Sequence, residues 1–67
     1  MTKRQSEMLE IIQAYIAEHG YSPSYRELQS AMNLHSISGV ARIADALQAQ
    51  GYIDKHIARA RSIRVLE

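Results

Sequence analysis

The chain has 67 residues, no cysteine, three histidines and a formal net charge of +1. It is long enough for one small domain, residues 1–67, and the lack of cysteine excludes disulfides and cysteine-ligated zinc. The histidines show no metal-ligand or catalytic spacing, so we expect no cofactor, no metal site and no enzyme activity. No apolar run approaches the roughly 18 residues of a membrane span, and the N-terminus lacks the apolar stretch of a signal peptide, so we expect a cytoplasmic protein.

The first segment has the pattern of an amphipathic helix over about residues 3–19. Thr2 and Gln5 have the spacing of a capping box, and Gly20 supplies a left-handed residue that ends the helix. The apolar residues recur every three or four positions, which predicts one buried stripe made of Met8, Ile11, Ile12, Tyr15 and Ile16.

Two shorter helices follow. Ser24 and Glu27 form a second capping box that starts a helix of about two turns, ending near Asn33, with the apolar face Tyr25, Leu28, Ala31 and Met32. Ser36 is the expected N-cap of a third helix that stops before Gly51, with the apolar face Ile37, Val40, Ile43, Ala44 and Leu47. A pair of helices joined by three or four residues matches the helix-turn-helix unit.

The last segment changes to a strand pattern. Tyr52 and Ile53 are strand formers, and polar and apolar residues alternate from Ser62 to Val65. We therefore expect a hairpin with its loop at residues 54–61, and we call this hairpin, residues 52–65, the wing. The sequence thus predicts a mainly α fold with a small β-hairpin, a three-helix winged helix-turn-helix.

The outward face of the third predicted helix carries small and hydrogen-bonding residues. Ser hydroxyls can bond bases or phosphates, Arg42 has the donors to bond guanine, and Gly39 permits close approach. The predicted contacts on this helix are Ser36, Ser38, Gly39, Ala41 and Arg42. An ordinary solvated face is the other interpretation, and for Ser36 a capping role is compatible with a phosphate contact.

Other cations and one tyrosine are candidates for the phosphate backbone. Tyr25 and Arg26 stand at the start of the second helix, where the Tyr25 hydroxyl is placed to bond a phosphate. The segment after Gly51 is locally basic because it contains Lys55, Arg59, Arg61 and Arg64 against Asp54 and Glu67. We expect the three arginines to divide between phosphate contacts and wing structure, with Arg61 the first choice for phosphate and Arg59 also at the interface.

The stretches GYSPSYREL, QGYI and ARSIRVL, together with Ser36 and Ser38, make nearly the whole chain resemble the DNA-binding domain of LexA-family repressors. The resemblance implies a sequence-specific transcriptional regulator, a repressor of the kind that governs the SOS response, with the third helix in the major groove and the wing on the backbone. Gly39, Ala41 and Arg42 depart from the residues usual in the family, so the bases recognised are expected to differ.

Members of that family also carry a peptidase and dimerisation domain with a Ser/Lys dyad, which these 67 residues do not contain. The chain therefore corresponds to a fragment or to a free-standing LexA-like protein. We expect a monomer or weak dimer in solution and two copies on an inverted-repeat operator in double-stranded DNA. The alternative function is a winged-helix protein-interaction module that acts on a transcription regulator, which would favour exposed aromatic or Met anchors.

Overall fold

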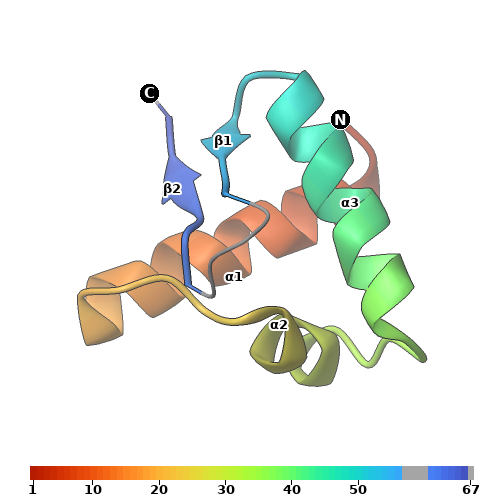
Figure 1. The fold of residues 1–67 in the computed structure, drawn as a ribbon, viewed down its shortest axis with the longest axis horizontal. Helices are drawn as coiled ribbons and strands as arrows, with labels where there is room; N and C mark the ends of the chain where they lie inside the picture. Colours follow the sequence, from red (N-terminus) through yellow and green to blue (C-terminus); the bar gives the residue numbers. More distant parts are fainter. Residues whose placement is uncertain (57–60, 67) are drawn as a thin grey trace.

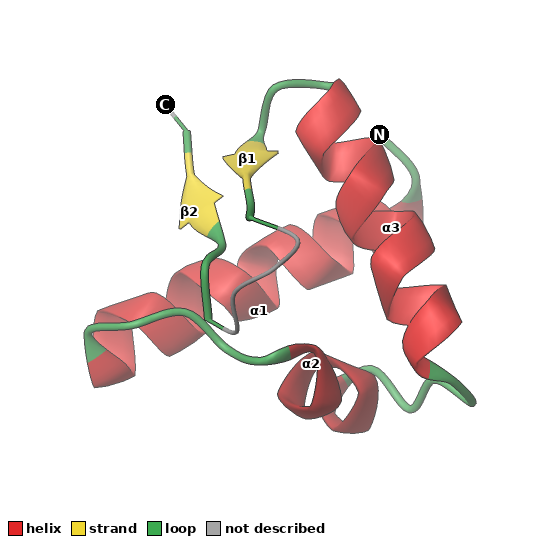
Figure 2. Cartoon of the chain, viewed as in Figure 1, coloured by secondary structure: helices red, strands yellow, loops and turns green. Residues whose placement is uncertain are grey.

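The computed structural model describes residues 1–56 and 61–66. Three helices precede a two-stranded hairpin: α1 is Lys3–His19, α2 is Tyr25–Ala31, α3 is Ile37–Ala49, β1 is Ile53–Asp54 and β2 is Arg64–Val65 (Figures 1 and 2). The predicted three-helix winged helix-turn-helix is confirmed. No helix in the described part of the chain is both long and apolar enough to cross a membrane.

The first two helices begin at the predicted caps. Thr2 Oγ1 accepts from Gln5 N while Gln5 Oε1 accepts from Thr2 N, both at 3.1 Å. Ser24 and Glu27 repeat this reciprocal pattern at 2.8 and 3.2 Å. Gly20 ends α1 with φ 82° and ψ 4°, a left-handed conformation that glycine adopts without steric cost.

One hydrophobic core joins all three helices to the wing. α3 packs against both α1 and α2, and β1 packs against α3. Burial of these apolar side chains is the main stabilising contribution in a domain without disulfides. The buried apolar residues are Met8, Ile12, Leu28, Met32, Val40, Ala44, Leu47, Ile53 and Ile63.

Two residues that the periodicity assigned to the core are exposed. Ala31 is exposed at the end of α2, and the Ile37 side chain in the first turn of α3 is 40% exposed. Periodicity defines a helix face but not where along the helix the packing partner ends. Those two assignments are wrong, whereas Ile11, Ile16 and Ile43 are partly buried and pack against the core.

The wing is an antiparallel hairpin with a short ladder. Ile53 pairs with Val65, and Asp54 pairs with Arg64. β1 has the length of the predicted segment 52–53 but lies one residue later, and Asp54 therefore belongs to the strand and not to the loop. β2 is shorter than the predicted segment 62–65, and Ser62 bonds instead with the backbone of His56. Ser62 Oγ accepts from His56 N and donates to His56 O, each at 2.9 Å.

Candidate nucleic-acid interface

The N-terminus of α3 is capped as the sequence predicts. Ser36 has the extended conformation of an N-cap, with φ −150° and ψ 159°, and its Oγ accepts from Gly39 N at 3.3 Å. The first amides of a helix have no intrahelical acceptors, so this end presents backbone donors as well as the Ser36 hydroxyl. Ser36 is exposed and remains accessible beside those donors.

The five residues predicted to contact DNA from the third helix lie together at its N-terminal half. Ser38 and Arg42 are exposed, while Gly39 and Ala41 are half-buried. Arg42 makes no ion pair with any other described residue, so its guanidinium is not neutralised by a carboxylate from that part of the chain. The helix therefore offers hydroxyls, backbone amides and one cation within two turns.

Gly39 is not required by the packing of the domain. A Cβ added there would lie 3.9 Å from Leu34 Cδ1, an ordinary van der Waals contact. The fold therefore has room for a methyl group at this position of α3.

Tyr25 and Arg26 are the first two residues of α2. Tyr25 is half-buried and packs against the core, whereas Arg26 is exposed. Among the described residues, Arg26 has no carboxylate within ion-pair distance. Within residues 1–56 and 61–66, Arg26 is therefore a second cation of the helix-turn-helix without a carboxylate partner.

Lys55 and Arg64 of the basic C-terminal segment each pair with a carboxylate within the domain. Lys55 Nζ lies 2.7 Å from Asp45 Oδ1, and the Lys55 side chain is only 7% exposed. The hydrogen bond with Asp45 raises the pKa of Lys55. Arg64 Nη2 donates to Asp54 Oδ2 at 3.1 Å, and this bond is the largest cause of a lowered Asp54 pKa. The wing is thus less basic at its surface than its sequence indicates.

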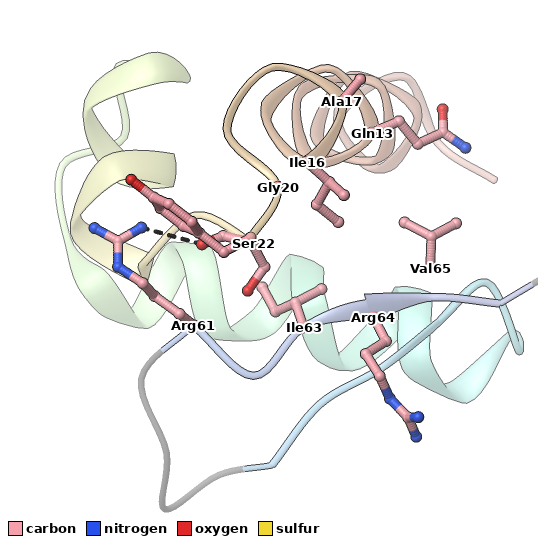
Figure 3. A pocket seen from close by; sticks show the side chains of 10 residues that line it. Gln13, Ile16, Ala17, Gly20, Ser22, Arg61, Ile63, Arg64 and Val65 are labelled. Carbon is pink, nitrogen blue, oxygen red and sulfur yellow. Dashed lines mark hydrogen bonds between the residues drawn. The ribbon is translucent and has the colours of Figure 1, made fainter.

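The wing arginines have different positions in the structure. Arg59 lies outside the described residues, whereas Arg61 contacts α1 and the segment leading into α2. Arg61 Nη1 donates to the Tyr15 hydroxyl oxygen and the Ser22 carbonyl oxygen, each at 3.1 Å, and Figure 3 shows the bond to Ser22. Two further pairs of atoms, Nη1–Oε1 and Nη2–Oε2, join Arg61 to Glu27 at 2.9 Å each. The phosphate contact expected of Arg61 stays a prediction.

Glu27 has two structural roles. Its Oε1 accepts from Ser24 N in the capping box of α2, and its Oε2 accepts from the Tyr15 hydroxyl at 3.1 Å as well as from Arg61. The Arg61 bond is the largest cause that lowers the pKa of Glu27 to about 2. Glu27 is therefore ionised at neutral pH and holds the base of the wing to α2.

A groove of about 560 Å³ lies between α1 and β2 (Figure 3). Its lining is mainly apolar and comes from α1, the link after it and the wing, which places the groove away from the N-terminal half of α3. The lining residues are Gln13, Ile16, Ala17, Gly20, Tyr21, Ser22, Arg61, Ile63, Arg64 and Val65.

Sequence comparisons identify the relatives of this fold. The family model of the LexA DNA binding domain matches residues 1–62. The LexA repressor of Novosphingobium aromaticivorans is 41% identical over 66 residues, 98% of this chain and 28% of the repressor. The LexA repressor of Erythrobacter litoralis is 39% identical over 67 residues, 100% of this chain and 29% of the repressor.

A third LexA repressor, from Granulibacter bethesdensis, is 36% identical over 66 residues, 98% of this chain and 27% of the repressor. The chain therefore spans less than a third of the length of these curated relatives. The family match itself covers all three helices and β1. This chain belongs to the LexA DNA binding domain family.

Proposed function

We propose that this domain binds double-stranded DNA sequence-specifically as a LexA-like transcriptional repressor, with α3 in the major groove and the wing on the backbone. The observation that carries the proposal is the gathering, at the N-terminal half of α3, of small polar residues and of Arg42, which has no ion-pair partner in the described part of the chain. In helix-turn-helix proteins this is the part of the recognition helix that contacts base edges.

The base contacts in this proposal come from α3. Ser36 and Ser38 offer hydroxyls for base edges or phosphates, and Arg42 offers the paired donors that match O6 and N7 of guanine. Gly39 and Ala41 are small enough for the helix to approach the groove floor closely. Ser36 can keep its capping bond to Gly39 N while it contacts DNA, because its side chain is exposed.

The phosphate contacts come from the start of α2 and from the wing. Arg26 is exposed, and the Tyr25 hydroxyl is the proposed second contact from α2. Arg59 and Arg61 are the proposed contacts from the wing. A guanidinium has five N–H donors, so Arg61 can keep its bonds to Glu27 and still donate to a phosphate oxygen.

Selection of bound sites from a random duplex pool tests the base contacts. Removing a bidentate arginine costs about 1–3 kcal/mol of discrimination, so Arg42→Ala is expected to relax the preference at one position of the selected site. Lys3→Ala is the matched control, because it removes one exposed cation from α1 and should leave the selected sequence intact. A selected site that is the same for wild type and Arg42→Ala would refute the base contact.

High-affinity binding is proposed to need two copies on an inverted repeat. The domain measures 26 Å along its longest axis, and half-sites one turn of DNA apart are separated by about 34–36 Å, so two copies fit side by side. We expect sedimentation to show a monomer or weak dimer alone and two copies on a palindromic duplex. A tight dimer without DNA, or saturation of the palindrome by one copy, would contradict this stoichiometry.

The groove between α1 and β2 favours one alternative, a protein-interaction module that acts on a transcription regulator. Its apolar lining is the kind of surface that buries a side chain of a protein partner. A module of that kind alone would not bind duplex DNA even at low salt, whereas phosphate contacts make DNA affinity fall as salt rises.

A further inference from the structure

Ile37 is a large apolar side chain that lies outside the hydrophobic core formed by the described residues. It is the first residue of α3 and is 40% exposed, and it is not one of the partly buried apolar residues that pack against the core. Truncation of this side chain should therefore cost the fold little. The residue is bulky and water-exposed at the helix end where base contacts are proposed.

The neighbours of Ile37 are smaller or polar. Ser36 and Ser38 flank it in sequence, and Ala41 follows it by four residues, which places the two on the same side of the helix. The branched Ile37 side chain is thus the main apolar projection of this turn. Arg42, without an ion-pair partner among the described residues, lies one turn further along and gives the same end of α3 a positive charge that suits DNA.

We infer that Ile37 is a specificity-determining residue that contacts the 5-methyl group of a thymine in the major groove. The inference rests on the proposed function, because it needs α3 to enter that groove. The thymine methyl is the apolar group among the major-groove features that distinguish the four base pairs, and an exposed aliphatic side chain is its chemical match. The hydroxyls of the flanking Ser36 and Ser38 can form hydrogen bonds with the polar atoms of adjacent bases.

Replacing thymine by deoxyuridine, which removes only the methyl group, tests this contact. The wild-type chain is first used to select a duplex, and each thymine of that duplex is then replaced in turn. We expect one thymine per half-site at which deoxyuridine weakens wild-type binding about fourfold per bound copy, the factor given by burial of one methyl group. The same replacement should have no effect on Ile37→Ala.

Leu66→Ala is the matched control, since Leu66 is a 42% exposed aliphatic residue beyond the wing, and it should keep the wild-type deoxyuridine penalty. The urea midpoint of Ile37→Ala should equal that of the wild type, which shows that the variant is folded. A deoxyuridine penalty that persists in Ile37→Ala would overturn the inference about Ile37, and so would the absence of a penalty at every thymine of a well-bound site. Either result would leave the proposed DNA binding intact. Failure of the wild-type chain to bind any duplex would instead overturn the proposed function.

Discussion

Arg61 and Glu27 are 34 residues apart in sequence and face each other through two pairs of atoms at 2.9 Å. Parallel two-point contacts of this kind fix the orientation of both side chains. Because Glu27 also caps α2, the pair links the start of that helix to the base of the wing. Arg61 has φ 55°, a left-handed conformation that is uncommon for a residue with a side chain, so its contacts hold the backbone where the chain enters the second half of the hairpin.

The first prediction is that this link is lost in strong acid. The pKa of Glu27 is about 2 in the folded domain against an ordinary 4.5, so the carboxylate stabilises the fold fully above pH 4.5 and loses this effect as pH falls towards 2. Urea midpoints of wild type and Glu27→Gln should therefore differ at pH 6 and converge near pH 2. A difference that stays constant across this range would contradict the assigned pKa.

The second prediction concerns the phosphate contact of Arg61. Arg61→Ala should weaken binding to all sequences about equally and reduce the slope of log affinity against log salt by roughly one. Glu27→Gln is the matched variant, because it disturbs the same pair without removing a cation and should leave the slope unchanged. If Arg61→Ala lowered stability while the slope stayed at the wild-type value, Arg61 would serve only to hold the wing.

The third prediction compares the two sides of the Lys55–Asp45 pair. Asp45→Ala leaves the buried Lys55 ammonium without its carboxylate partner and should lower the free energy of unfolding by about 1–3 kcal/mol. Lys55→Met should cost less, because it keeps an apolar stem in the same place and removes the charge that needs a partner. Chemical denaturation of both variants measures the difference, and an equal or larger loss for Lys55→Met would contradict the account.

Local features of this fold were predictable from the sequence, whereas ion pairs between residues far apart in the chain were not. The capping boxes of Thr2 with Gln5 and Ser24 with Glu27 each lie within four residues, so a short motif is sufficient to identify them. The exposure of Ile37 was not predictable in this way, because it depends on where the neighbouring helices end and not on the local sequence pattern.

The same limit applies to the charged residues of the wing. In the sequence, Lys55 and Arg61 belong to a locally basic segment. Their carboxylate partners, Asp45 and Glu27, lie 10 and 34 residues earlier in the chain, on α3 and α2. No local spacing indicates such pairs. The candidate contacts on α3 lie together because they belong to one helix and its N-cap, and their contact with DNA stays a prediction.

The fourth prediction is that Gly39→Ala stabilises the domain. The added Cβ makes an ordinary contact with Leu34, and alanine is favoured over glycine within a helix by about 0.5–1 kcal/mol. We expect a higher urea midpoint together with weaker DNA binding, since the backbone at Gly39 is proposed to approach the groove closely. A lower midpoint would contradict the expected gain in stability.

The most direct test of DNA binding is a set of isotherms for this chain on random-sequence duplex at several salt concentrations. With Arg26, Arg59 and Arg61 each on a phosphate, log affinity should fall linearly with log salt with a slope of about −3 per bound copy, because each neutralised phosphate contributes about −0.9. Binding that is absent at the lowest salt, or that does not change with salt, would contradict the proposal that this domain acts on DNA.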